Sequence, residues 1–388
     1  MFQIRTMNKI SPSGLSHFPS GEFTYGDDIA SPDAILVRSA SLHEIELPAS
    51  LKAVARAGAG VNNIPVEKCS ESGIVVFNTP GANANAVKEL VIGAMLLTAR
   101  NIPYAIDWAK TLTGSGDEVP KLVEKGKSKF AGPELAGKKL GVIGLGAIGV
   151  MVANTAHSLG MEVYGFDPYL SVDSAWGISR AIKRAPSLKA LFECSDFITV
   201  HVPLSPETRG HLNAEAFASM KRGVRLFNFA RGELVANADL KEALASGQVA
   251  SYTHDFPNDE LLGVPNVISI PHLGASTPES EDNCASMAAQ ELIGFLRMGT
   301  IRNSVNFPNA EMPFTAETRI TVIHKNIPNM LSQISSNIAS QGINIENMLN
   351  KSKKEYAYTI LDISGDSIDK TVEGLKKIEG VIRVRVIR

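Results

Sequence analysis

The stretch GVIGLGAIG, residues 141–149, places Gly144, Gly146 and Gly149 in GxGxxG spacing. Gly144 directly follows the apolar run Leu140 to Ile143, and the glycine motif opens the amphipathic segment MVANTAHSLG. The glycines therefore lie in a predicted strand-to-helix turn, where they permit a tight bend and the close approach of a pyrophosphate to free N–H groups. This context predicts a dinucleotide-binding βαβ unit.

An acidic residue further along the chain indicates which dinucleotide is bound. The run EVYGFD ends in Asp167, eighteen positions after Gly149. Its carboxylate can accept hydrogen bonds from an adenosine ribose. Pro168 and Tyr169 follow, where a basic residue would be needed to pair with a 2′-phosphate. We therefore predict NAD rather than NADP.

Length and composition restrict the possible classes of protein. A chain of 388 residues predicts two or three domains, and 44% apolar and 20% charged residues are typical of a soluble globular protein. A net charge of −2 gives no case for nucleic acid or a membrane surface as partner. Cys69, Cys194 and Cys284 are too scattered for a disulfide framework or a metal site. With neither a signal pattern nor an apolar span, we expect a cytoplasmic protein.

Strand-like runs alternate with helical patterns, which predicts an α/β protein with parallel sheets. A first series contains residues 34–39, 51–58 and 74–79, followed by a helix over 86–100. A second series begins at Lys139 with KLGVIG and continues through EVYGF, DFITVHVP, GVRLFNFAR, VASYTHDF and NVISIPH. The polar stretch 110–130 between them reads as a solvated loop or irregular arm. The two series predict two separate domains.

The C-terminal part of the chain starts a new pattern. An amphipathic helix is predicted over ESEDNCASMAAQELIGFLRMG, and the stretch FPNAEMPFTAET has the composition of a linker. The rest spells strand, helix, strand, strand, helix, strand, from RITVIH to VIRVRVI. This order predicts a compact ferredoxin-like module.

Polar residues follow three strands of the second series. Arg231 follows one strand, the stretch HDFPNDELLG with Asp255, Asp259 and Glu260 follows another, and His272 of PHLGAST follows a third. The carboxyl ends of strands are where open α/β sheets bind ligands. Oxidation of a 2-hydroxy acid needs an arginine for the substrate carboxylate, an imidazole for the hydroxyl proton and a carboxylate to orient the imidazole. The cofactor carries the hydride.

With these motifs the chain resembles the D-isomer-specific 2-hydroxyacid dehydrogenase family, with an ACT domain at its C-terminus. The matching segments are ARAGAGVNNI, NTPGANANAVKEL, GVIGLGAIG, FNFARGELV and IPHLGAST. The resemblance implies a flavodoxin-like substrate domain (1–82 and 281–306), a Rossmann-type NAD domain (83–280), a linker (307–317) and a βαββαβ ACT domain (318–388). It also implies a homo-oligomer.

The resemblance assigns roles to individual residues. Arg231 corresponds to the carboxylate-binding arginine and His272 to the general acid/base. The residues expected around the cofactor are Gly144, Gly146, Ala147, Ile148, Gly149, Asp167, Pro203, Ala230 and Asp255.

The catalytic carboxylate departs from the family pattern. The family commonly has DVFxxEP, and this chain has HDFPNDELLG. A register set by Phe256 and Pro257 assigns the role to Asp259, and one set by Asp255 assigns it to Glu260. We favour Glu260, because its longer side chain can reach an imidazole on a neighbouring loop, and keep Asp259 as the alternative.

The first domain is expected to hold the other end of the substrate. Arg38 ends a strand, and Arg56, Ala57 and Gly58 lead into a glycine-rich turn whose N–H groups can hold an anion. Asn83 follows in TPGANANA. In family members that act on a phosphorylated 2-hydroxy acid, residues at matching positions contact the phosphate. A surface ion pair is the alternative for Arg38.

The ACT domain implies an amino-acid effector. His324, Asn326 and Asn344 match positions that bind L-serine in regulated homologues. The family often has glycine after the proline of this motif, and here Asn329 follows Pro328. A dimerisation surface without an effector is the alternative.

Two other functions are compatible with these motifs. A dehydrogenase for an unphosphorylated acid, such as hydroxypyruvate, glyoxylate or 2-ketoglutarate, would need the same three catalytic groups. An NAD(H)-sensing protein of the corepressor kind could be built on the same fold.

Overall fold

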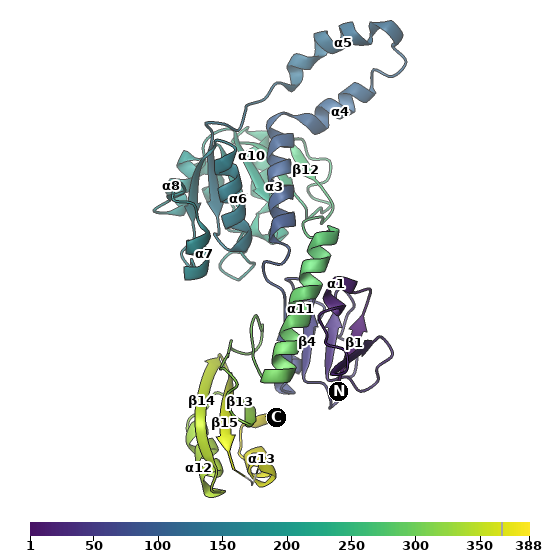
Figure 1. Ribbon diagram of the computed structural model, residues 1–388. Helices are drawn as coiled ribbons and strands as arrows, with labels where there is room; N and C mark the ends of the chain where they lie inside the picture. The colour runs from purple at the N-terminus through teal and green to yellow at the C-terminus, as the bar shows by residue number, and fades with distance from the viewer. Residues whose placement is uncertain (366–367) are drawn as a thin grey trace. The chain divides into compact units, whose positions relative to one another are not determined.

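The computed structural model describes residues 1–365 and 368–388, which divide into two compact units. Unit 1 consists of Met1–Asn83 and Pro278–Arg388, and unit 2 is Ala84–Thr277 (Figure 1). The first boundary between the units, after Asn83, lies one residue after the expected boundary at 82. The second boundary, before Pro278, lies three residues before the expected one at 281. The C-terminal module belongs to unit 1. No helix among the described residues is long and apolar enough to cross a membrane.

Unit 2 is a doubly wound α/β domain around a parallel seven-stranded sheet, in the order β12-β11-β10-β9-β6-β7-β8. The strands are β6 (Lys139–Ile143), β7 (Glu162–Phe166), β8 (Lys183–Arg184), β9 (Phe197–Val200), β10 (Val224–Asn228), β11 (Val249–His254) and β12 (Val267–Ser269). The six strands predicted from the sequence are all present, which confirms the Rossmann-type fold. The short β8 was not predicted.

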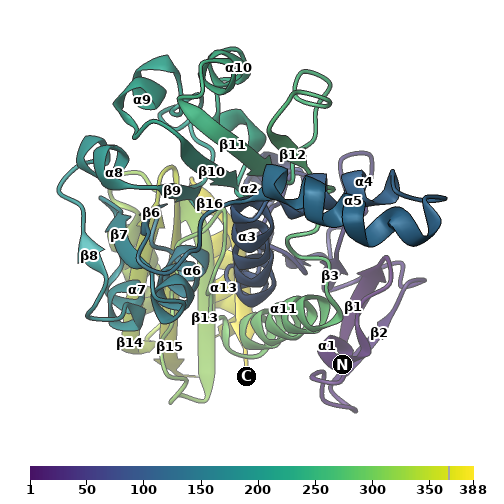
Figure 2. The same cartoon turned by 90° about the horizontal axis from the view of Figure 1, so that it is seen from above.

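Helices cover both faces of this sheet (Figure 2). The helices of unit 2 that pack around it are α3 (Ala84–Ala99), α6 (Ala147–Ser158), α7 (Val172–Gly177), α8 (Leu188–Cys194), α9 (Ala214–Ser219) and α10 (Asn237–Ala245). One apolar core lies under α3 and α6, and a second lies under α8, α9 and α10. Burial on both faces is what makes these strands nearly continuous apolar runs in the sequence.

The stretch 110–130, predicted as a loop or irregular arm, is mostly helical, and this part of the prediction was wrong. It follows α4 (Ile102–Lys110) and contains η1 (Gly116–Glu118), α5 (Val119–Gly126) and η2 (Lys127–Phe130), in an arm that extends from the sheet (Figure 1). The Trp108 and Phe130 rings lie 5.3 Å apart, and a Cβ on Gly126 would lie 2.2 Å from the Trp108 ring. Packing against one tryptophan thus orders a segment whose composition is that of a loop.

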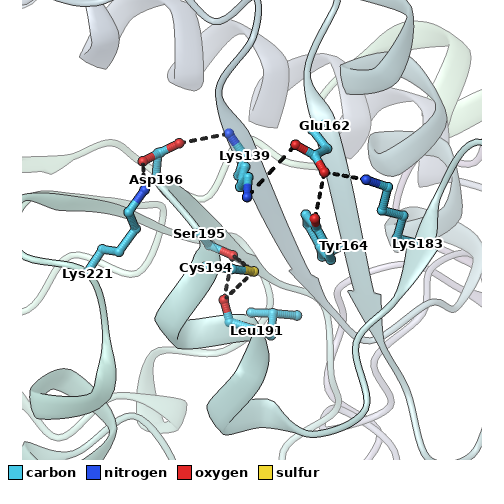
Figure 3. Close-up of polar contacts among 9 residues, drawn as sticks. All are labelled: Lys139, Glu162, Tyr164, Lys183, Leu191, Cys194, Ser195, Asp196 and Lys221. Atoms are coloured by element: carbon cyan, nitrogen blue, oxygen red, sulfur yellow. Dashed lines mark hydrogen bonds and ion pairs between the residues drawn. The ribbon is translucent and has the colours of Figure 1, made fainter.

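The amino ends of the strands are joined by a polar network that is structural (Figure 3). Asp196 accepts from the Lys139 backbone N–H at 2.9 Å and from the Lys221 ammonium at 2.6 Å. Glu162 pairs with Lys183 and accepts from the Tyr164 hydroxyl. Because ligands of parallel α/β sheets bind at the carboxyl ends, this network fixes the sheet at the edge opposite the candidate site.

The first part of unit 1 is a parallel five-stranded sheet in the order β2-β1-β3-β4-β5, which is the flavodoxin-like order. Its strands are β1 (Phe2–Met7), β2 (Phe23–Gly26), β3 (Ala34–Val37), β4 (Ala53–Arg56) and β5 (Val75–Phe77), with helices α1 (Pro12–Leu15), α2 (Val66–Glu71) and α11 (Pro278–Met298). The last three strands and α11 were predicted from the sequence. The prediction missed β1, β2 and the two short helices.

The ACT module has the predicted βαββαβ order, and its antiparallel sheet runs β14-β15-β13-β16. The elements are β13 (Thr318–Lys325), α12 (Met330–Ser340), β14 (Asn344–Lys353), β15 (Tyr356–Ser364), α13 (Ile368–Lys376) and β16 (Val381–Ile387). One face of the sheet packs under α12 and α13. The other face contributes Ile323, Tyr358 and Ile360 to a core shared with Phe295 of α11.

A fully buried ion pair holds this module against α11. Arg319 donates through Nε to Asp362 at 2.6 Å and through Nη2 at 2.9 Å. The same guanidinium donates to the carbonyls of Met298, Met312 and Pro313. The segment predicted as a linker is therefore docked against the module, and Phe307 and Ala310 within it are buried.

Candidate active site

The glycine-rich turn between β6 and α6 contains three glycines, and the surroundings of each one differ. Gly144 adopts a φ of 89°, and a Cβ there would lie 2.6 Å from the His201 carbonyl oxygen. A Cβ on Gly149 would lie 1.9 Å from the carbonyl oxygen of Gly144. Gly146 precedes α6, is exposed, and a Cβ there would meet nothing within 4 Å. Backbone packing therefore requires Gly144 and Gly149, whereas Gly146 leaves room for a ligand at the helix start.

The residues around this turn fit a dinucleotide. Ala147 and Ile148 begin α6, whose first N–H groups and dipole favour an anion. Asp167 follows the adjacent strand β7, and its carboxylate accepts from the backbone N–H of Leu145 and of Tyr169, each at 2.8 Å. The predicted ribose-binding carboxylate thus lies directly beside the turn.

Two further predicted cofactor residues follow β9 and β10. Pro203 is exposed, and its carbonyl accepts from the Thr208 hydroxyl at 2.7 Å. The Ala230 N–H donates to the Asn228 side chain at 3.1 Å. Sequence reasoning missed His201, whose pKa is lowered to about 3 by burial. Its ring is therefore neutral and adds no positive charge beside the turn.

Arg231, Asp255 and His272 come together at the carboxyl ends of β10, β11 and β12. Asp255 is buried, and this burial raises the pKa of its carboxyl group. The positive charges of His272 and Arg231 and the Gly274 N–H act in the opposite direction, so all three lie near this carboxyl. The His272 ring is exposed and contacts the Phe256 ring edge-on, with centroids 4.8 Å apart.

Arg231 begins the short helix η3 (Gly232–Leu234) and is held by its backbone. The Asn228 side chain donates to the Arg231 carbonyl at 2.8 Å and is itself 3.2 Å from the Tyr252 hydroxyl. One guanidinium nitrogen, Nη1, donates to the Ala230 carbonyl at 2.6 Å. The rest of the exposed guanidinium points from a fixed backbone position, as a group that clamps a carboxylate should.

Three carboxylates follow β11 and are candidates to act on His272. Glu260 is exposed and accepts from the Asn237 amide at 3.0 Å, and Asp259 is exposed in the same turn. Asp255, predicted only as a cofactor residue, is the candidate carboxyl group whose pKa the positive charge of His272 lowers. β11 ends at His254, so Asp255 directly follows the strand end, whereas Asp259 and Glu260 lie further along the following turn.

His254 itself is a buried structural residue. Its Nε2 lies 2.8 Å from the Ser269 hydroxyl, and its ring stacks on Tyr252 at 4.8 Å. Burial lowers its pKa to about 4, so the ring is neutral at physiological pH. In the register set by Phe256 and Pro257, this neutral ring takes the place of the family's strand-end aspartate.

The predicted substrate residues of unit 1 gather at the carboxyl ends of β3 and β4. The Arg56 Nε donates to the Arg38 carbonyl at 3.1 Å. Arg38 forms an ion pair with Glu281 of α11 at 2.6 Å, which is the alternative considered for it. Gly58 has a φ of 153° and lies under the Arg56 guanidinium, and the Ala57 N–H donates to the Val37 carbonyl. Asn83 is the last residue of this part of unit 1.

The three predicted effector residues lie in different surroundings. His324 is buried in the ACT sheet, with Nδ1 2.8 Å from the Lys325 carbonyl and Nε2 2.9 Å from the Thr359 hydroxyl. Asn326 and Asn344 are exposed. A ligand could therefore contact the two asparagines directly, whereas a contact with His324 would have to replace a hydrogen bond of the sheet.

Comparison with known proteins identifies the family. Residues 92–274 match the D-isomer specific 2-hydroxyacid dehydrogenase, NAD binding domain, and residues 320–383 match an AHAS small subunit-like ACT domain. The chain is 32% identical to D-3-phosphoglycerate dehydrogenase of Escherichia coli K12 over 84% of this chain and 79% of that protein. The chain belongs to the D-isomer-specific 2-hydroxyacid dehydrogenase family. Unit 2 is the NAD-binding domain of this family.

Other relatives extend the comparison. D-3-phosphoglycerate dehydrogenases of Methanocaldococcus jannaschii and Bacillus subtilis are 39% and 35% identical over 73% and 79% of this chain. The chain spans about half the length of these curated relatives, 53% and 59%. The NAD⁺-bound 3-phosphoglycerate dehydrogenase of Entamoeba histolytica matches with a TM-score of 0.60 and 25% identity, covering 79% of this chain and 98% of that one.

Proposed function

We propose that this chain catalyses the NAD-dependent oxidation of D-3-phosphoglycerate to 3-phosphohydroxypyruvate, the first step of L-serine biosynthesis. The proposal is supported by the cluster of His272, Asp255 and Arg231 at the same sheet edge as the glycine-rich turn, and by relatives named for this activity. The first test is to mix the purified protein with NAD⁺ and D-3-phosphoglycerate and to measure the absorbance of the NADH that forms. No absorbance change under any condition would refute the proposal.

The roles of the residues follow from their chemistry. The His272 imidazole takes the proton of the substrate hydroxyl, and Asp255 holds the imidazole in place and balances the charge that it gains. Arg231 binds the substrate carboxylate by charge-assisted hydrogen bonds. NAD, when bound, supplies the acceptor for the hydride.

Arg38 and Arg56 supply two cations for the 3-phosphate. We expect Arg38→Ala to raise KM for D-3-phosphoglycerate by roughly tenfold or more, because a charged hydrogen bond to the phosphate is lost. The matched control is Glu281→Gln, which breaks the ion pair with Arg38 and keeps the arginine. Steady-state kinetics of both variants should show a raised KM for the first only. Equal effects on phosphorylated and unphosphorylated substrates would remove Arg38 from phosphate recognition.

A second candidate is a reductase of an unphosphorylated 2-keto acid. A glyoxylate reductase from Paecilomyes thermophila has a TM-score of 0.63 with 25% identity, over 78% of this chain and 98% of that one. A substrate without a phosphate would leave the Arg38 and Arg56 pair without a role. Direct comparison of substrates distinguishes the two candidates.

The ACT module is proposed to bind L-serine as an effector. Asn329 supports an intact motif, because it adopts a φ of 68°, the left-handed conformation that glycine favours and asparagine tolerates. We expect L-serine to lower kcat in the full chain and Asn344→Ala to abolish this inhibition without changing uninhibited kcat. A titration that leaves both rate and Tm unchanged would favour a dimerisation role alone.

We also propose a homo-oligomer that forms through α3 and the helical arm. Leu96, Leu97, Tyr104 and Ile106 are exposed there, and large apolar groups exposed together are typical of interfaces. Sedimentation velocity should give a species larger than a monomer that Ile106→Asp dissociates. A monomeric wild-type chain would contradict this assembly.

A further inference from the structure

A cavity of about 350 Å³ lies in unit 1 along one face of α11, away from the residues assigned above. Met287, Glu291 and Met298 line it from the helix, at spacings that place them on one face. Residues after the helix, among them Arg302, Asn303 and Glu311, form the facing wall.

Glu291 lies in the wall of the cavity with half of its carboxylate unpaired. The residue is only 9% exposed. Its Oε1 accepts from the Asn303 amide at 2.7 Å, and its Oε2 has no hydrogen-bond partner among the described residues. Burial raises the pKa of this carboxyl group to about 8. A buried acceptor without a partner is costly, which indicates a site that is completed by something else.

The neighbouring charges do not neutralise Glu291. Arg302 also lines the cavity, but it forms a two-point ion pair with Glu311, with Nε to Oε2 at 2.8 Å. Backbone hydrogen bonds between Ile301 and Ala310, at 2.8 and 2.9 Å, hold these two residues side by side. The pair cancels its own charge, so ionised Glu291 leaves the cavity with one net negative charge.

The other walls suit a short aliphatic group. Met287 and Met298 supply flexible apolar side chains. Gly294 leaves the helix face open, because a Cβ there would reach only the Thr300 Cβ, at 3.9 Å. A volume of this size exceeds the need of a bare cation and lies at the small end of ligand pockets.

We propose that this cavity binds a short aliphatic amine, whose ammonium group donates a hydrogen bond to Glu291 Oε2 and whose carbon chain lies against Met287 and Met298. The ammonium supplies both the missing donor and the missing positive charge. Nothing in this binding depends on the dehydrogenase reaction.

The test uses propylammonium chloride as probe with the full chain at pH 8.5. At this pH most of the Glu291 carboxyl is ionised, while an aliphatic amine with a pKa near ~10.4 keeps its proton. Isothermal titration, with sodium chloride at equal ionic strength and 1-propanol as blanks, should show saturable binding of propylammonium only. Glu291→Gln should weaken it at least tenfold, whereas Glu317→Gln, which removes an exposed charge of the same unit outside the cavity, should not.

A second variant tests the cavity without touching the carboxylate. Gly294→Leu fills the open helix face with a good helix former, and it should abolish binding while the far-ultraviolet circular dichroism stays unchanged. No saturable heat up to 50 mM propylammonium would overturn the proposal. So would unchanged affinity in Glu291→Gln, or equal binding of 1-propanol, which would make the hollow an apolar or water-filled cavity only.

Discussion

Replacement of His272 by glutamine is expected to lower kcat for D-3-phosphoglycerate oxidation by about 10²- to 10⁴-fold, the usual contribution of a general base. Glutamine keeps the polarity and approximate size of the side chain but cannot accept a proton. KM for NAD should change little, because the glycine-rich turn lies between β6 and α6 and Asp167 follows β7, whereas His272 follows β12. Steady-state kinetics with both substrates varied measure the two effects separately.

His211→Gln is the matched control for this variant. His211 is also an exposed histidine of unit 2, but it has no assigned role in catalysis. Its kcat should equal that of the wild type. A His272→Gln variant that retains kcat within threefold would show that another group takes the proton.

Asp255→Asn is expected to lower kcat on the order of 100-fold, since the amide cannot balance the charge that His272 gains. Glu260→Gln should have no comparable effect, because the Glu260 carboxylate bonds Asn237 in an exposed turn. The pair of variants therefore distinguishes Asp255 from Glu260 as the carboxylate that acts on His272. The reverse result would return the role to Glu260 and require the turn to rearrange when substrate binds.

The pH dependence of kcat/KM gives an independent test of the role of Asp255. Burial raises the pKa of this carboxyl group, so its protonated form is reached at a higher pH than for an exposed aspartate. If the ionised form is the active one, activity present above this pKa is lost as the pH falls through it. Asp255→Asn should remove this contribution from the acid limb of the kcat/KM profile. An acid limb that is the same in both proteins would exclude Asp255 from it.

Sequence reasoning succeeded where one local pattern decides the structure. The central strands β6, β9, β10 and β11 are mostly buried and read as apolar runs. Glycine is required at 144 and 149, because an added Cβ would lie 2.6 and 1.9 Å from a backbone carbonyl oxygen. The βαββαβ order of the ACT module followed from alternating periodicities in the same way. In each case the information lies within a few consecutive residues.

Other features depend on contacts between residues that are distant in the sequence. The arm over 110–130 is ordered by Trp108 against Gly126 and Phe130, which no local pattern reveals. The linker is docked through Arg319, whose partners come from α11, β15 and the linker itself. The choice between Asp259 and Glu260 depended on the register of the stretch that follows β11, and strand ends are the least certain part of a sequence-based assignment.

The measurement that tests the central proposal most directly is NADH oxidation by the purified protein with 3-phosphohydroxypyruvate, compared with hydroxypyruvate, glyoxylate and 2-ketoglutarate. We predict a kcat/KM for the phosphorylated keto acid at least 100-fold above each of the others, because only this substrate engages a phosphate site at Arg38 and Arg56. Equal or faster turnover of an unphosphorylated acid would contradict the proposed substrate and retain the dehydrogenase chemistry. Tight NADH binding without turnover of any of them would contradict the enzymatic function itself.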